Sequence, residues 1–280
     1  METPGFIASG NNELFSFYHE PDAPNGKPAF VLSHAFGEEK LWSHRVFVSL
    51  ARQLAGLGHP VLRFDYAGTG DSGGTLRDSS IASHQSDLGA AVRWLRQKVG
   101  PARAVGLIGL RLGATVAALL AEVARDSEEI TGPLILWDPI TDGEAYVQEL
   151  LRSHLSTQLA VYGRVVEGRD SLRDRIRRGE CVNLDGYELA AGLHDSCAVK
   201  ELLPRSARLF QGPCLVVQIA PPANAKPRAD LQELARCYPH GTFIQATEEP
   251  FWKEIRAYYG HAPNLEGSTL NWLKGELADG

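Results

Sequence analysis

Residues 104–121 read AVGLIGLRLGATVAALLA, and this stretch decides the fold of the chain. The apolar run Ala104–Gly109 predicts a buried strand, and the segment Leu112–Arg125 has the apolar spacing of a helix. Gly109 and Gly113 stand two residues before and two residues after Arg111. A sharp turn from strand to helix brings the two backbones so close that it requires small residues at these places. We therefore predict such a turn, with Arg111 at its tip.

The same order of strand and helix recurs on both sides of this stretch. Nearly continuous apolar runs predict strands buried on both faces at Ala29–Ser33, Pro60–Asp65, Pro133–Trp137, Pro213–Ile219 and Thr242–Ala246. Helical periodicity is found at Val46–Leu57, Ile81–Val99, Ala229–Tyr238 and Phe251–Tyr259. Repeated alternation of strand and helix predicts an α/β protein, with a mostly parallel, doubly wound sheet covered by helices.

The alternation stops between residues 139 and 208, where no run reads as a strand and the segments are helical or polar. A stretch of this length is too long for a loop in a compact domain. We predict a helical insertion that forms a lid over the carboxyl edge of the sheet. The core then comprises residues 1–138 and 209–280, and the lid comprises residues 139–208. The alternative is a peripheral helical decoration.

Composition limits the kinds of partner and location. The chain has 280 residues and a net charge of −6, so it offers no general basic field for nucleic acid. Its four cysteines form no CxxC pair, which favours free thiols over a zinc site or disulfides. Its start lacks the pattern of a signal peptide, and no apolar run is long enough to span a membrane. We expect a soluble, cytoplasmic protein that needs no metal and no cofactor.

The segment FDYAGTGDSGGT, Phe64–Thr75, satisfies three motif patterns at once. It contains G-x-G-x-x-G of dinucleotide-binding proteins, G-x-S-x-G of hydrolases and the GDSGG of trypsin-like proteases. No helix starts promptly after the glycines, the alternation is not that of an all-β protease, and Ser72 lies several residues beyond a strand. We interpret the segment as a glycine-permitted turn whose Asp71 and Ser72 satisfy free backbone groups.

Four segments give the chain a resemblance to a known family: FVLSHAFGEEK, the region from Ser43 to Gly74, GLIGLRLGATVAALLA and LILWDPI. They resemble the α/β-hydrolase fold in its serine-aminopeptidase-like branch. The GLRLGA turn, the Trp137-Asp138-Pro139 sequence and the GYEL segment at 186–189 are most similar to the hydrolases associated with bacterial exosortase A systems. The resemblance implies a nucleophile at the turn, an acid after the penultimate strand and a histidine after the last strand.

The chain departs from that pattern at each of the three places. Arg111 stands where the nucleophile is expected, and a permanently protonated guanidinium cannot attack a carbonyl. The penultimate strand leads into IAPPANAKPRAD, in which no carboxylate precedes Asp230. The last strand leads into ATEEPFWKE without a histidine, and the next one is His261. Hydrolysis through an acyl-enzyme is therefore not supported.

Arg111 is the central binding candidate. At a helix N-terminus its guanidinium suits a carboxylate or phosphate, so one hypothesis is an anion site under the lid. The alternative is that Arg111 pairs with Asp138, Glu38 or Glu39 and fills a dead site. We expect the rest of the site to be lined by Phe36, Glu39, Leu112 and Trp252.

Two residues are candidates for catalysis. His34 opens the loop that supplies oxyanion-hole donors in this fold and could act as a general acid or base. Asp138 ends a strand beside the turn and could be a relocated acid. The alternatives are that His34 only anchors its loop, that Asp138 belongs to an ordinary turn, and that His44 caps a helix or orients the His34 loop.

Three functions follow from these candidates. In the first, the protein is an enzyme that acts on an acylated or anionic small molecule without a serine nucleophile. In the second, it is an inactive relative of hydrolases that binds an anionic ligand or a protein partner. In the third, it is an ordinary esterase or peptidase whose nucleophile lies elsewhere.

Overall fold

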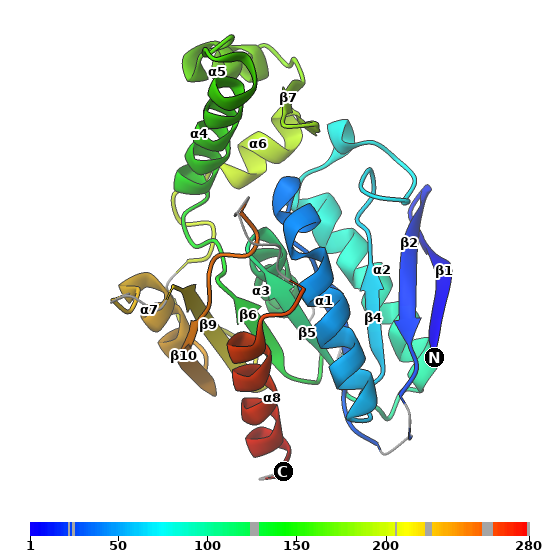
Figure 1. Cartoon of the computed structure of the whole chain (residues 1–280). Helices are drawn as coiled ribbons and strands as arrows, with labels where there is room; N and C mark the ends of the chain where they lie inside the picture. Colours follow the sequence, from blue (N-terminus) through cyan, green and yellow to red (C-terminus); the bar gives the residue numbers. More distant parts are fainter. Residues whose placement is uncertain are drawn as a thin grey trace.

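The computed structural model describes residues 1–278, apart from residues 22, 24–25, 124–128, 205, 222–225 and 254–259. Its centre is an eight-stranded sheet with the order β1-β2-β4-β3-β5-β6-β9-β10 (Figure 1). The strands β4, β3, β5, β6, β9 and β10 are parallel, and β1 and β2 are antiparallel. The strands are β1 Glu2–Ser9, β2 Asn12–His19, β3 Ala29–Ser33, β4 Val61–Phe64, β5 Val105–Leu110, β6 Leu134–Trp137, β9 Cys214–Ala220 and β10 Gly241–Thr247.

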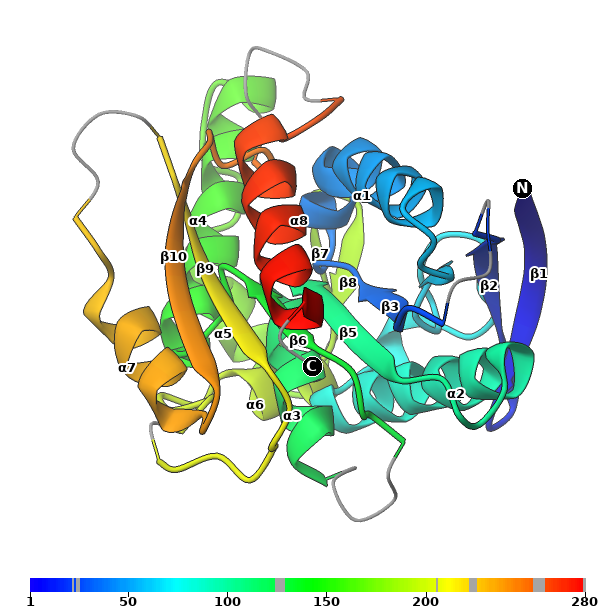
Figure 2. The same ribbon diagram turned by 90° about the horizontal axis from the view of Figure 1, so that it is seen from below.

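Helices cover both faces of this sheet (Figure 2). Helices α1 (Glu38–Gly56) and α8 (Pro263–Ala278) lie on one face. Helices α2 (Ile81–Val99), α3 (Leu112–Val123) and α7 (Ala229–Cys237) lie on the other. The central strands are buried along their whole length, as in β3, β5 and β9, because both of their faces pack against helices. The predicted doubly wound α/β architecture is therefore confirmed.

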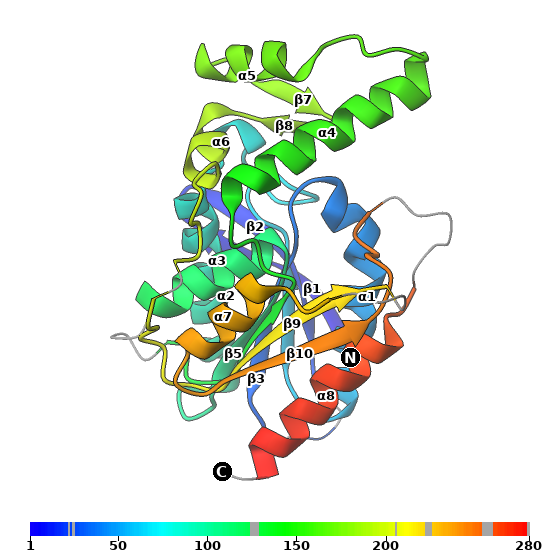
Figure 3. The same ribbon diagram turned by 90° about the vertical axis from the view of Figure 1, so that its left-hand side faces the viewer.

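The segment between β6 and β9 projects from the carboxyl edge of the sheet (Figure 3). It contains α4 (Gly143–Tyr162), α5 (Arg169–Arg177) and α6 (Ala191–Cys197). It also contains a hairpin of β7 (Val182–Leu184) and β8 (Tyr187–Leu189), so the prediction that no strand occurs there was wrong. The turn of this hairpin places Asp185 and Gly186 at positive φ.

The six predicted strands are all present, within one residue of their expected ends. The N-terminal hairpin β1–β2, the helix α8 and the short 3-10 helix Leu76–Asp78 were not predicted. Of the helix predicted at Phe251–Tyr259, residues 254–259 lie outside the described part of the chain. Among the described residues, none of the helices combines the length and apolarity needed to cross a bilayer.

The turn between β5 and α3 has the predicted sharpness. Arg111 takes a left-handed backbone conformation with φ of 54°, which costs an ordinary residue free energy. A Cβ on Gly113 would lie 2.3 Å from the carbonyl oxygens of Ser33 and His34. A Cβ on Gly109 would lie 2.5 Å from the Cα of Ala114. The two glycines thus allow β3, β5 and α3 to approach, and this approach fixes Arg111 at the tip.

Candidate functional site

Arg111 and Asp138 stand side by side at the ends of neighbouring strands. The Arg111 N–H donates to the carbonyl of Trp137 at 2.9 Å, and the Asp138 N–H donates to Val217 at 2.8 Å. Asp138 also has a positive φ, of 45°. Two adjacent charged residues in this backbone region are uncommon, and the parallel sheet register is what brings them together.

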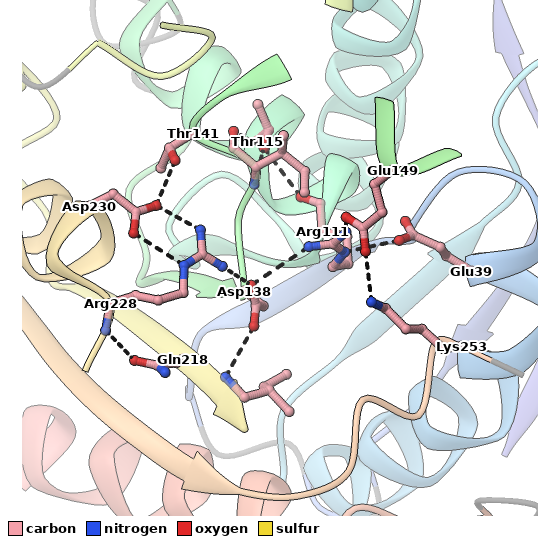
Figure 4. Close-up of polar contacts among 12 residues, drawn as sticks. Glu39, Arg111, Thr115, Asp138, Thr141, Glu149, Gln218, Arg228, Asp230 and Lys253 are labelled. Carbon is pink, nitrogen blue, oxygen red and sulfur yellow. Dashed lines mark hydrogen bonds and ion pairs between the residues drawn. The ribbon is translucent and has the colours of Figure 1, made fainter. Parts of the chain in front are cut away.

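Three carboxylates surround the guanidinium of Arg111 (Figure 4). Its Nε donates to Glu39 at 3.0 Å, and one terminal nitrogen donates to Glu149 at 2.7 Å. The other terminal nitrogen lies 3.8 Å from Asp138. Every nitrogen of the guanidinium therefore has an acidic neighbour within the protein.

Aromatic rings enclose the same guanidinium. Its carbon lies 5.2 Å from the ring centre of Trp252 and 5.4 Å from that of Tyr146, at distances typical of cation–π contacts. The Tyr146 hydroxyl donates to Glu39 at 2.9 Å, so the aromatic and acidic groups belong to one network. Only 5% of Arg111 is exposed. Its charge is satisfied by the protein rather than by water.

The pKa values in this network reflect burial opposed by ion pairing. Burial raises the pKa of the Glu39 and Asp138 carboxyls, and Arg111 partly offsets this effect in both. Burial also acts against ionisation of Glu149, but Arg111 and Lys253 outweigh it and lower the pKa of that carboxyl. Burial disfavours the charged form of Arg111, yet the three carboxylates raise its pKa. The arginine is permanently charged and holds the acids together.

A second arginine extends the network on the far side of Asp138 (Figure 4). Arg228 donates to Asp138 at 2.6 Å and to Asp230 at 2.7 Å. Asp230 also accepts a hydrogen bond from Thr141 at 2.7 Å. Asp138 is thus shared by two arginines, and its carboxylate is oriented by cations rather than by an imidazole.

Trp252 and Lys253 occupy the loop after β10, where the resemblance places a histidine. Lys253 binds Glu149 at 2.7 Å, and Trp252 stacks on Arg111. His261 lies elsewhere and forms a 2.7 Å hydrogen bond with Ser49. Ser49 is buried within α1 and lines none of the described cavities. This serine–histidine contact joins α1 to the start of α8.

His34 is fixed by its own loop. Its Nδ1–H donates to the carbonyl of Ala35 at 2.7 Å, which leaves Nε2 to accept from the Tyr66 N–H at 3.4 Å. Burial is the main cause that lowers the pKa of His34, to about 3. Both ring nitrogens have backbone partners and the ring is neutral, so this histidine has the features of an anchor.

Ser72 has no feature of a nucleophile in the structure. Its hydroxyl donates to the carbonyl of Asp65 at 2.6 Å and accepts from the Phe15 N–H at 2.8 Å. Gly68, Gly70 and Gly74 in the same turn have positive φ. The interpretation of this segment as a structural turn agrees with these contacts.

A cavity of about 630 Å³ lies above the Arg111 network, between the sheet edge and the inserted segment. Part of the network forms its wall, namely Glu39, Glu149, Trp252 and Lys253, whereas Arg111 does not line it. Its apolar wall comes from Phe36, Trp42, Leu150, Ala160, Leu184, Tyr187 and Trp252. Its volume suits a small organic ligand.

Helix α4 gives this cavity a polar side that sequence reasoning missed. Arg152, Ser153, Ser156 and Thr157 all line it, at spacings that bring them to one side of the helix. Arg152 has no ion pair with any described residue, in contrast to Arg111. In the sequence, the one sign of this polar side is the spacing of the polar residues between 152 and 157. That signal is weak, because the sequence does not show which segment the helix faces.

Two indole groups at the cavity lack acceptors. The Nε1–H groups of Trp42 and Trp252 are buried and have no hydrogen-bond partner within the described structure. An unsatisfied buried donor costs about 1–3 kcal/mol, so such groups are rare without a reason. Both belong to residues that line the 630 Å³ cavity.

The predicted site residues fall into two groups. Arg111, Glu39, Asp138 and Trp252 are brought together in one network. His34 and Leu112 instead line a separate small cavity, and Phe36 lines both. The described residues contain no cluster of histidine, cysteine and acidic side chains that could hold a metal ion.

Comparison with solved structures shows the same architecture elsewhere. Est1E from Butyrivibrio proteoclasticus, solved with ferulic acid bound, superimposes with a TM-score of 0.69 at 18% identity, over 98% of this chain and 99% of that one. A putative hydrolase from Agrobacterium vitis gives a TM-score of 0.62 at 16% identity, over 99% and 98%.

The chain has the α/β-hydrolase fold. A family model described as alpha/beta hydrolase fold matches residues 28–132, which include the elbow at Arg111. The chain is also 29% identical over 137 residues to the lysophosphatidylserine lipase ABHD12 of Danio rerio. That alignment covers 49% of this chain and 33% of the relative, so the chain spans about a third of the relative's length.

Proposed function

We propose that this α/β-hydrolase-fold protein binds a small amphiphilic anion in the 630 Å³ cavity without hydrolysing it. One observation carries the absence of hydrolysis. The residue at the elbow, Arg111, is engaged by Glu39, Asp138 and Glu149, so no attacking atom and no free cation is presented there.

The neighbouring groups support the same conclusion. A serine-independent enzyme would need a general acid or base with a free lone pair or proton near the ligand. His34 is held by two backbone groups, and Asp138 is paired with Arg228 at 2.6 Å. This geometry favours the alternative in which Arg111 closes a former catalytic centre, and it makes the network a rigid floor for the cavity.

The cavity lining supports an amphiphilic ligand. Its aromatic and aliphatic wall favours an acyl chain or an aromatic ring. Four acids also line the cavity: Glu38, Glu39, Glu149 and Asp185. Arg152 and the hydroxyls beside it favour a carboxylate or phosphate at α4, because three of these acids are already paired with Arg111 or His154. Ferulic acid, bound to the structural neighbour Est1E, and lysophosphatidylserine, in the name of the matched lipase, are both amphiphilic anions.

The absence of hydrolysis is tested with a fluorophosphonate probe and a series of p-nitrophenyl acyl esters. We expect no labelled serine and no ester cleavage above the buffer rate, with an active esterase as the positive control. Labelling that disappears in Ser72→Ala or Ser49→Ala would contradict the proposal and identify a nucleophile. Cleavage without labelling would instead support the serine-independent enzyme.

Ligand binding is tested by thermal shift and calorimetry with fatty carboxylates and the matching alcohols. We expect the carboxylates to bind more tightly, and Arg152→Ala to weaken them roughly tenfold, because it removes one charged hydrogen bond of about 1.5 kcal/mol. Arg45→Ala, an exposed arginine of α1 outside the cavity, is the matched control. Equal affinity for acid and alcohol would exclude the anion site.

Several expectations from the sequence stay predictions in this proposal. They are the action of residues 139–208 as a lid, the link to exosortase A systems, the cytoplasmic location and the independence from metal, cofactor and nucleic acid. The cavity supports the lid proposal most directly, because residues of α4 and of the β7–β8 hairpin form part of the cavity wall.

A further inference from the structure

The last turn of α4 and the loop that follows it carry an unusual concentration of exposed apolar side chains. Five of them fall within eight residues, and each is between 41% and 66% exposed: Leu159, Val161, Tyr162, Val165 and Val166. We call these residues the apolar tip. Water-exposed apolar side chains are ordinary when scattered, but a contiguous group marks an interaction surface.

The apolar tip lies at the end of the inserted segment that is farther from the sheet. Figure 3 shows α4 rising away from the core, with its C-terminal end and the start of the turn at the outer limit of the molecule. Gly163 ends α4 in a left-handed conformation, with φ of 67°, and turns the chain. A flat surface could therefore reach the tip without meeting the core.

The surroundings of the tip are basic, although the chain as a whole is acidic. Residues 159–180 contain six arginines and four acidic residues, in a chain of net charge −6. Arg164 stands inside the tip, is exposed, and has no ion pair with any described residue. Arg169 follows at the start of α5, where its side chain is 46% exposed and lies 3.9 Å from the 89% exposed side chain of Asp170.

The apolar tip is next to the 630 Å³ cavity along α4. Ser156, Thr157 and Ala160 line the cavity from α4, and Leu159 and Val161 belong to the same turn of that helix. Arg152 lies about two turns earlier on α4 and also lines the cavity. A partner bound at the apolar tip would therefore lie next to the α4 wall of the cavity.

We infer that the apolar tip docks on an anionic lipid bilayer. Exposed apolar side chains flanked by arginines are the combination that binds at the interface of a bilayer with anionic headgroups. A second copy of this chain fits less well, because two tips of the same positive charge would repel each other. The inference rests on the tip and not on the proposed ligand, so it stands or falls independently.

The test is co-sedimentation with vesicles of phosphatidylcholine, with and without phosphatidylglycerol. We expect the full chain to bind the phosphatidylglycerol vesicles, and to bind them less at high salt, because screening weakens contacts between charges. Val165→Asp with Val166→Asp should lower binding at least roughly tenfold, since both acids oppose insertion and add repulsion. Arg164→Glu should lower it by a similar factor, and Arg164→Lys should retain it.

Leu209→Asp is the matched control, because Leu209 is 50% exposed but follows the inserted segment instead of belonging to its tip. Circular dichroism of each variant shows whether it is folded, and the fluorophosphonate and ligand assays remain separate readouts. No sedimentation with anionic vesicles would overturn the inference. So would equal losses in Leu209→Asp and the tip variants, or a dimer in light scattering that the tip variants dissociate.

Discussion

Arg111 stands at the elbow, where the resemblance to α/β-hydrolases implies a nucleophile. Its backbone keeps the strained conformation of an elbow, with φ of 54°, while its side chain binds three acids. Replacing a buried ion pair by apolar groups is often tolerated, but removing one partner leaves uncompensated charge. We therefore expect that replacing Arg111 mainly lowers the stability of the fold, and that it changes the shape of the cavity floor to a smaller extent.

Arg111→Ala should lower the free energy of unfolding by about 3–5 kcal/mol near neutral pH. The pKa values of Glu39 and Asp138 are already raised by burial, and loss of Arg111 raises them further. A carboxyl whose pKa is higher in the fold gives its full stability below its unfolded pKa, and loses it as the pH rises through the folded pKa. The loss caused by the variant should therefore be smaller near about pH 5 than near about pH 8.

Urea denaturation followed by tryptophan fluorescence at the two pH values measures this difference, with Arg45→Ala as the control. A loss of the same size at both pH values would mean that the carboxylates do not depend on Arg111.

At the scale of elements, the elbow is determined by how closely β3, β5 and α3 approach. Most of this could be read from the sequence, because the apolar runs and the paired glycines around Arg111 are local signals. The hairpin β7–β8 could not, because three-residue strands are defined only by their pairing. Nor could β1, which contains Pro4 and Gly5 and gains its hydrogen bonds from β2.

Gly113→Ala should destabilise the fold by about 1–3 kcal/mol or more, because its Cβ would lie 2.3 Å from two carbonyl oxygens. Gly267→Ala is the matched control: its Cβ in α8 meets nothing within 4 Å, so the variant should gain up to about 1 kcal/mol from helix propensity. Thermal unfolding of both variants against the parent measures the contrast. Similar effects of the two substitutions would contradict the packing argument for the elbow.

At the scale of the whole molecule, buried histidines link the stability of the core to pH, and burial lowers the pKa of each: His19, His34, His59 and His84. Burial is the largest cause in each, and it lowers the pKa of His34 to about 3 and those of His19 and His84 to about 4. A histidine whose pKa is lower in the fold stabilises it above the unfolded pKa and loses this contribution as the pH falls towards the folded pKa. On acidification the histidines therefore lower the free energy of unfolding, whereas Glu39 and Asp138, whose pKa values are raised, increase it.

The free energy of unfolding should fall by about 1–2 kcal/mol per histidine between about pH 7 and pH 5. His84→Phe should remove one such contribution while keeping a ring against Tyr66, whose centroid lies 4.5 Å from that of His84. Chemical denaturation of the parent and the variant across this range gives both slopes. An unchanged slope in His84→Phe would show that His84 is not protonated on unfolding.

The amino-acid sequence alone is enough to predict the α/β-hydrolase fold and the cation at its elbow, because apolar runs, helical spacing and paired glycines act between near neighbours in the chain. It also named Glu38, Glu39 and Asp138 as the candidate partners of Arg111. Only the tertiary structure decided that Glu39 and Asp138 meet it, together with Glu149 from a helix 38 residues further on. It also decided that Arg152, at the cavity, has no ion pair with any described residue, because contacts between distant segments depend on packing that no local pattern encodes.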